Sequence, residues 1–96
     1  MADPTVVFRV TCTADDPQAP ARILGIFAAR SLLPQRFSSL WVGPSELIEI
    51  EIECEYSEDL IPEHLARVLD RIPTVTDVKL VVDGQKIAVA PIFTDA

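Results

Sequence analysis

Carboxylates are the residues of this sequence whose number and spacing best suit chemistry. Within the stretch Glu46–Tyr56 (ELIEIEIECEY), a glutamate occupies every second position over 49–55. Side chains two apart on a β-strand point to the same face, so the sequence predicts a strand with one carboxylate face and one apolar face. The carboxylate face comprises Glu49, Glu51, Glu53 and Glu55. The apolar face comprises Ile48, Ile50, Ile52, Cys54 and Tyr56.

A cation site is the first chemistry to consider for this glutamate row. Hard cations such as calcium do take carboxylate oxygens. However, neighbours on one face of a strand lie ~7 Å apart, so two of these side chains bridge an ion only awkwardly. We therefore interpret the row as the solvent-facing side of a sheet. The alternative is that a basic partner docks onto it.

The other reactive residue types form no recognisable catalytic or metal-binding arrangement in the sequence. His64 is the single histidine, and no second histidine or cysteine accompanies it in its segment, although a zinc site needs several such ligands. The sequence contains no Ser/His/Asp or Cys/His arrangement and no Gly-rich phosphate loop. We expect a surface or boundary position for His64, and no catalytic residue, metal or cofactor.

Charge and hydropathy exclude several classes of partner. The 96 residues include 15 acidic and 8 basic side chains, which gives a formal net charge of −7. Nucleic acids and anionic membranes attract clustered Lys and Arg, whereas the basic residues here are scattered. No apolar run approaches the ~20 residues that cross a bilayer, and the N-terminus lacks the basic and apolar blocks of a signal peptide. The expected location is the cytoplasm.

The first half of the chain predicts a strand, a helix and a second strand. Residues 5–13 alternate between apolar and polar types, which indicates a strand. Apolar residues then recur at intervals of three and four, which predicts a helix over 19–33 that ends at Pro34. Gly25 within this helix is expected to allow its close approach to a sheet. Residues 36–42 form the second strand.

The glutamate-rich strand is followed by a second helix and a further strand. The apolar stripe of this helix extends over 61–72, with Pro62 in the first turn, where a missing N–H is tolerated. Residues 75–82 form the next strand. Asp83-Gly84 is a two-residue hairpin signal, and it predicts an added strand over about 85–93.

This β-α-β-β-α-β order predicts a single α+β domain over 1–96 with a ferredoxin-like core at about 5–82. In that fold an antiparallel sheet carries both helices on one face, and the first and third strands are central. Cys12 and Cys54 then lie at opposite ends of the sheet, roughly 20 Å apart at ~3.4 Å per residue. We expect no disulfide between them.

The sheet surface gives two further expectations. Arg9 and Lys79, on neighbouring strands, should share the glutamate face and form cross-strand ion pairs. The strand over 36–42 should be an edge strand, which must be covered or paired. Its aromatic residues Phe37 and Trp41 share one face, and they suit a subunit interface as well as a core.

The segment after the first strand resembles a known family. Asp15-Asp16-Pro17-Gln18 precedes Ala21-Arg22-x-x-Gly25-x-Phe27-x-x-Arg30. This loop and helix resemble those of ACT domains, in particular those of the small regulatory subunits of acetolactate synthase. The resemblance implies a dimer that holds an amino-acid effector between protomers, through the loop after the first strand and the start of the second. The residues at those positions are Asp15, Asp16, Gln18, Ala19, Leu33 and Pro34.

Two positions depart from the family pattern. Gln18 replaces a glycine, and Leu33 replaces an asparagine that contacts ligand in acetolactate synthase subunits. Pro20 removes one N–H donor near the helix start. These departures weaken the expectation of amino-acid binding.

The resemblance implies a non-enzymatic regulatory module. It would form a homodimer and bind a catalytic enzyme subunit of branched-chain amino-acid biosynthesis, such as acetolactate synthase, with an amino acid as effector. Two alternatives remain open. One is a stand-alone amino-acid or small-molecule sensor, and the other is an enzyme of the ferredoxin-like fold that works at a dimer cleft.

Overall fold

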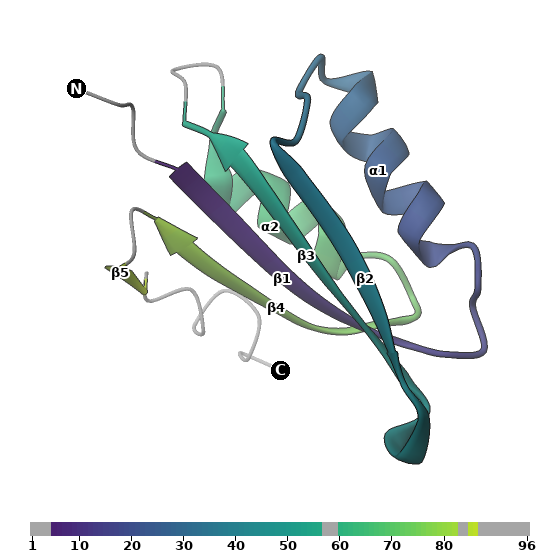
Figure 1. The fold of residues 1–96 in the computed structure, drawn as a ribbon. Helices are drawn as coiled ribbons and strands as arrows, with labels where there is room; N and C mark the ends of the chain where they lie inside the picture. Colours follow the sequence, from purple (N-terminus) through teal and green to yellow (C-terminus); the bar gives the residue numbers. More distant parts are fainter. Residues whose placement is uncertain (1–4, 57–59, 83–84, 87–96) are drawn as a thin grey trace.

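Eight elements follow one another in the part of the chain that the computed structural model describes, residues 5–56, 60–82 and 85–86. Their order is β1 (Thr5–Thr13), α1 (Ala19–Ala29), β2 (Arg36–Val42), the 3₁₀ turn η1 (Gly43–Ser45), β3 (Leu47–Glu55), α2 (Pro62–Asp70), β4 (Val75–Val82) and β5 (Gln85–Lys86). The strands form one antiparallel sheet in the order β2-β3-β1-β4-β5. The fold is ferredoxin-like, which confirms the predicted class (Figure 1).

β1 lies at the centre of the sheet, because β3 pairs with one of its edges and β4 with the other. In the β1–β3 register, Cys12 lies opposite Ile48 and Cys54 lies opposite Val6. The two cysteines therefore occupy opposite ends of this pair of strands. Both are buried and unbridged, as predicted.

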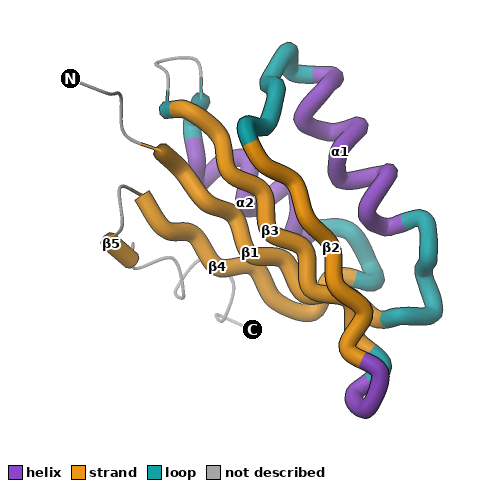
Figure 2. The backbone as a smooth tube through the Cα atoms, viewed as in Figure 1, coloured by secondary structure: helices purple, strands orange, loops and turns teal. Residues whose placement is uncertain are grey.

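The core lies between one face of the sheet and the two helices (Figure 2). Alternate residues of β1 and β3 are buried in this core. Two residues of α1, Ile23 and Phe27, and two of α2, Leu65 and Leu69, belong to the same hydrophobic cluster. The rings of Phe8 and Phe27 lie 5.4 Å apart at an interplanar angle of 79°, the edge-to-face arrangement that aromatic pairs favour. Among the described residues no polar or charged side chain is buried, so apolar burial holds these layers together.

α1 ends four residues earlier than predicted, at Ala29. Ser31 takes a positive φ of 57°. Its N–H donates to the carbonyl of Ala28 at 3.0 Å, and the N–H of Leu32 donates to the carbonyl of Phe27 at 2.9 Å. A left-handed residue with these bonds closes a helix, so the chain turns before it reaches Pro34.

β3 is also shorter than the predicted strand over 46–56. It begins at Leu47 because Glu46 takes a left-handed conformation with a φ of 53°. It ends at Glu55, and Tyr56 is exposed instead of extending the apolar face.

The start of α2 confirms the prediction for Pro62, which occupies the first turn. Ile61, expected on the apolar stripe, precedes the helix and is 60% exposed. Val82 pairs with Gln85, as expected for a two-residue hairpin connection. The rest of the predicted added strand, 87–93, lies outside the described residues.

The expectation for Gly25 is wrong. Gly25 is exposed, and a Cβ built at this position would meet no heavy atom within 4 Å. Ile23 and Phe27, two residues to either side, are the buried residues of this helix segment. Gly25 therefore lies on the outer side of α1 and provides no close approach to the sheet.

Replacing Gly25 with alanine should raise the free energy of unfolding by about 1 kcal/mol, because glycine costs about that much in a helix interior and the added methyl group meets empty space. Urea denaturation of Gly25→Ala and of the unmodified chain, at one protein concentration, measures the difference. A less stable variant would contradict the outward position of this residue.

Candidate functional site

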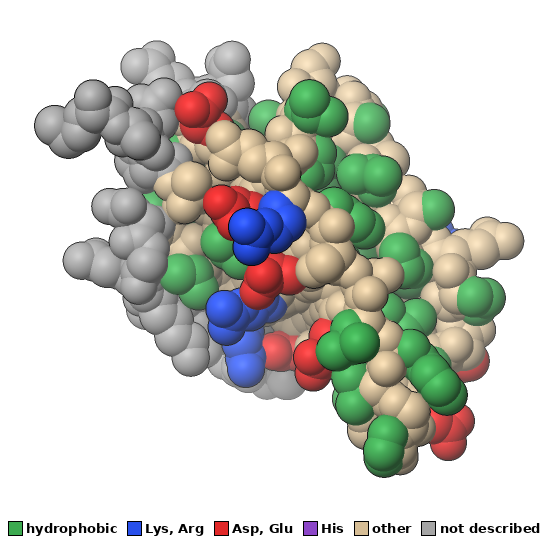
Figure 3. All heavy atoms as spheres, in the orientation of Figure 1, with side chains coloured by type: hydrophobic (Ala, Val, Ile, Leu, Met, Phe, Trp, Pro, Cys, Tyr) green, Lys and Arg blue, Asp and Glu red, His purple; other side chains and the backbone are tan. Residues whose placement is uncertain are grey.

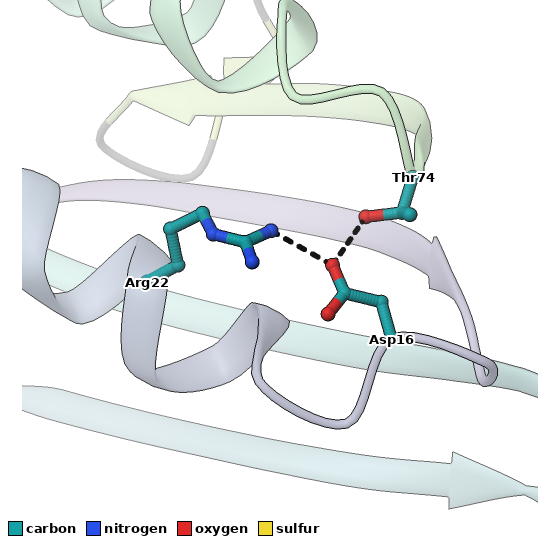
Figure 4. Close-up of polar contacts among 3 residues, drawn as sticks. All are labelled: Asp16, Arg22 and Thr74. Atoms are coloured by element: carbon teal, nitrogen blue, oxygen red, sulfur yellow. Dashed lines mark hydrogen bonds and ion pairs between the residues drawn. The ribbon is translucent and has the colours of Figure 1, made fainter.

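The loop after β1 is held by the carboxylate of Asp16. Its Oδ2 accepts one hydrogen bond from Thr74 Oγ1 and one from Arg22 Nη1, each 2.8 Å long (Figure 4). Arg22 belongs to the first turn of α1, and Thr74 precedes β4. The N–H of Thr13 also donates to the carbonyl of Thr74 at 2.9 Å. One carboxylate oxygen thus joins the β1–α1 loop, α1 and the α2–β4 connection.

These partners keep Asp16 ionised. The Thr74 hydroxyl first, and then the Arg22 guanidinium, hold the pKa of the Asp16 carboxyl below its ordinary value of 3.8. Hydrogen bonds and a nearby cation both favour the charged form of a carboxyl group. The family resemblance assigns this carboxylate to an effector, but groups of the chain itself occupy its Oδ2, which indicates a role in positioning the loop.

The other predicted ligand residues divide into two groups. Asp15 and Gln18 are exposed in the β1–α1 loop, whereas Ala19 has no exposed surface in a single chain. Leu33 and Pro34 follow the opposite end of α1, whose 11 residues span about 16 Å. One copy of the chain therefore does not bring the two groups together, and a site that uses both would take them from two copies.

Two positions at the start of α1 offer no free backbone N–H to an effector carboxylate. The N–H of Ala19 is used by the carbonyl of Asp16 at 3.1 Å, and Pro20 has no N–H. Gln18 takes an ordinary right-handed conformation, with a φ of −91°, and its side chain makes no capping hydrogen bond. The glycine of the family pattern is not needed for this backbone.

The face of the sheet away from the helices carries the predicted glutamate row. Arg9 Nε donates to Glu51 Oε2 at 3.0 Å, which confirms one predicted cross-strand ion pair. Lys79 shares this face, as predicted, because it lies opposite Arg9. The prediction of a cross-strand partner for Lys79 is wrong, since its Nζ lies 3.9 Å from Oδ2 of Asp77 on the same strand. Exposed pairs of this kind contribute at most about 1 kcal/mol each.

An open hollow of about 410 Å³ lies over these charges. Basic and acidic side chains interleave there (Figure 3). Its lining includes Arg9, Lys79, Glu49, Glu51, Asp77 and Leu40. Within residues 5–56, 60–82 and 85–86, no three His, Cys, Asp or Glu side chains cluster closely enough to hold a metal ion.

A smaller hollow, of about 170 Å³, lies between the end of α1 and the start of α2. Arg30, Leu32, Ile61 and His64 contribute to its lining, and His64 is exposed, as expected.

None of the described helices has the length and apolar character needed to cross a membrane.

Large apolar side chains are exposed along the β2 side of the molecule (Figure 3). Trp41 is 66% exposed, Leu40 is 63% exposed, and Leu33, in the connection before β2, is 89% exposed. Phe37 is half-buried against the core. We call Leu33, Leu40 and Trp41 together the β2-edge surface.

Sequence reasoning singled out Trp41 but missed the apolar exposure of Leu40. A charge signal marks the same region. Residues 17–45, which include α1 and β2, contain three arginines and no Asp or Glu, although the chain has 15 acidic residues. The acidic residues of this chain are therefore absent from the segment that forms the β2-edge surface.

The thiols of Cys12 and Cys54 have raised pKa values, which makes them unreactive. Burial, followed by the charge of Asp16, raises the pKa of Cys12. Burial, followed by the charge of Glu53, raises the pKa of Cys54 to about 11. Because the thiolate is the reactive form, neither cysteine should exchange disulfides at neutral pH while the chain is folded.

Asp16→Asn should lower the melting temperature at pH 7, because it removes the ionised acceptor of Thr74 and Arg22. A carboxyl group whose pKa is lower in the folded state stabilises the fold above its unfolded pKa, and that contribution disappears as the pH falls through the folded pKa. The difference between variant and unmodified chain should therefore shrink below pH 3.8. Thermal unfolding from pH 7 to pH 2 measures it, with Asp15→Asn as the exposed control. A difference that does not change with pH would contradict the role of the charge.

No family model and no curated protein sequence matches the chain. Among solved structures, the chain is similar to the solution structure of the C-terminal domain of the MgtC protein from Mycobacterium tuberculosis. The TM-score is 0.69 at 16% sequence identity, and the alignment covers 91% of this chain and 95% of that domain. At this identity the similarity shows a common fold, and it does not transfer an activity.

Proposed function

We propose that this chain is a non-catalytic regulatory module of the ACT type, which acts by associating with other protein chains. The observation that carries the proposal is the β2-edge surface, where Leu33, Leu40 and Trp41 are each more than 60% exposed. Several large apolar side chains exposed on one side of a small domain mark a candidate site of protein association. Tryptophan is also enriched among the residues that dominate binding energy at interfaces.

The regulatory role is supported by the loop and helix over 15–30 and by the ferredoxin-like fold in which they lie. On this proposal the partner is the catalytic subunit of an amino-acid biosynthetic enzyme such as acetolactate synthase, and the setting is the cytoplasm. An amino-acid effector would bind between two copies, near Asp15 and Gln18 of one copy and Leu33 of the other. It would shift the regulated equilibrium by its difference in affinity for the two states.

Mixing the chain with the catalytic subunit of a thiamine-dependent acetolactate synthase tests this proposal. We expect a complex by sedimentation velocity at micromolar concentration and a changed rate of synthesis. Leu33→Ala should weaken the complex, whereas Ile61→Ala, at a side chain that is 60% exposed outside the β2-edge surface, should not.

The effector is tested in the same preparation by adding valine, leucine or isoleucine. An effector present at 100 times its dissociation constant should add ~2.7 kcal/mol to the stability of the species that binds it, visible as a higher melting temperature. A chain that forms no complex with the synthase subunit, and leaves its rate unchanged with and without these amino acids, would contradict the proposed function.

A further inference from the structure

The larger hollow, on the open face of the sheet, is wide enough to hold a small molecule. Its volume of about 410 Å³ falls within the ~300–1,000 Å³ that is typical of ligand sites. Residues of β1, β2, β3 and β4 line it. The described lining includes none of the residues near which the effector was placed, Asp15, Gln18 and Leu33. A ligand held here would therefore occupy a second site.

The charges around this hollow form two rows across the sheet (Figure 3). In the first row, Arg9 of β1 lies directly opposite Lys79 of β4. In the second row, Thr11 of β1 lies between Glu49 of β3 and Asp77 of β4. Because the rows are two residues apart along the strands, they are separated by ~7 Å. The cations of the first row thus lie beside the carboxylates of the second.

Two of these charges are available to a ligand. Arg9 is paired with Glu51 at 3.0 Å, whereas Lys79 Nζ lies 3.9 Å from Asp77 and its side chain is 57% exposed. Within the described part of the chain, Glu49 has no ion-pair partner. Like charges directly opposite each other repel, so an anion at Lys79 would also reduce its repulsion from Arg9.

The mixture of charges selects a ligand that carries both signs. A simple anion that reached Lys79 would also meet the carboxylates of Asp77 and Glu49. A simple cation that reached Glu49 would also meet Arg9 and Lys79. A zwitterion avoids both costs, because its ammonium group pairs with Glu49 and its carboxylate pairs with Lys79.

The distance between Glu49 and Lys79 restricts the length of this zwitterion. The two residues lie on either side of β1 and one row apart. Strands ~4.8 Å apart and rows ~7 Å apart give a diagonal of roughly 12 Å between their Cα atoms. Side chains stand roughly perpendicular to a sheet, so their charged ends keep about this separation. Two charge-assisted hydrogen bonds of ~2.8 Å then leave about 6–7 Å between the two charges of the ligand.

A dipeptide fits this length. Two extended residues span at most ~7 Å, whereas one amino acid spans about half of that and three residues span about 10 Å. The β2 side of the hollow adds an apolar contact, because Leu40 lies directly opposite Glu49 and is 63% exposed. With the ammonium group at Glu49, the side chain of the first ligand residue lies beside Leu40.

We propose that this hollow binds a dipeptide whose first residue is apolar. Its ammonium group pairs with Glu49, its carboxylate pairs with Lys79, and its backbone crosses β1 diagonally over Thr11. This site goes beyond the proposed function, and binding to it does not require association with another chain.

NMR titration of the whole chain with leucyl-alanine tests the site. A ligand of this size in an open hollow should have a dissociation constant of about 1 mM. We expect saturable shifts of the backbone amides of Val10, Thr11 and Ile50, which line the hollow, and no shift at Gln18. The absence of saturable shifts at about 50 times that concentration would overturn the proposal.

Three further ligands test the need for two charges at this spacing. N-acetyl-leucyl-alanine lacks the ammonium group, leucyl-alanine amide lacks the carboxylate, and leucine carries both charges too close together. Each should bind about fivefold more weakly than leucyl-alanine, the effect of losing one exposed ion pair. Equal affinity of a blocked dipeptide would overturn the two-charge requirement, and equal affinity of leucine would overturn the dipeptide length.

The order of the two ligand residues tests the contact with Leu40. Alanyl-leucine has the same atoms as leucyl-alanine but carries its large apolar side chain away from Leu40. It should bind about threefold more weakly, because less apolar surface is removed from water. Affinity equal to or higher than that of leucyl-alanine would contradict the apolar first residue.

Substitutions of single charges provide the matched control on the protein side. Glu49→Gln and Lys79→Gln should each raise the dissociation constant of leucyl-alanine about fivefold. Glu55→Gln and Arg36→Gln change exposed charges of the same face outside the described lining, and they should change it less than twofold. All four side chains are exposed, so the variants should fold, which their melting temperatures verify. Equal effects of the site and control variants would show a general attraction by charge and overturn the site.

Discussion

The structure depends on the pairing of β1 along both of its edges. Alternate residues of β1 face the two helices and are fully buried, as Phe8 is, while Arg9 between them faces solvent. A slip of one residue against β3 or β4 would exchange these two side chains, so the burial of β1 fixes the register of three strands at once. Asp16 then ties the end of β1 to α1 and to the start of β4 through Arg22 and Thr74. β2 pairs with β3 alone and is left at the edge.

The strands were predictable because their pattern is local. The alternation in residues 5–13 and in the glutamate-rich stretch specifies which side chains meet the core, and the order of elements then restricts the topology. The end of α1 was not predictable, because serine rarely takes the left-handed conformation that Ser31 adopts there. The outward position of Gly25 could have been predicted from the sequence. Ile23 and Phe27 are four residues apart and therefore share one face of the helix, and a residue midway between them points to the opposite side.

The candidate site was less predictable than the fold. Asp16 was predicted to be a ligand-binding residue of the loop. Its structural partner Thr74 lies 58 residues away, and no local pattern connects the two. Lys79 prefers its neighbour Asp77 because the register places Arg9, a like charge, directly opposite. Leu40 is exposed because β2 lies at the edge of the sheet, which the residue type of leucine does not reveal. Tertiary contacts and edge positions therefore account for what the sequence did not reveal.

The distribution of charge gives the two sides of this small domain different properties. The glutamate row, with the ion pair between Arg9 and Glu51, keeps the open face of the sheet in water. The acid-free segment supplies α1 and the exposed apolar residues of β2. In this account the central sheet is a scaffold, and association at its edge links the fold to regulation.

Amide hydrogen exchange at low and high protein concentration tests that claim most directly. The account predicts that the N–H groups of β2 that point away from β3 exchange more slowly at high concentration, because a second copy of the chain covers them. The amides of β1, which are paired on both sides at any concentration, should not change. Exchange in β2 that is the same at both concentrations would contradict the account.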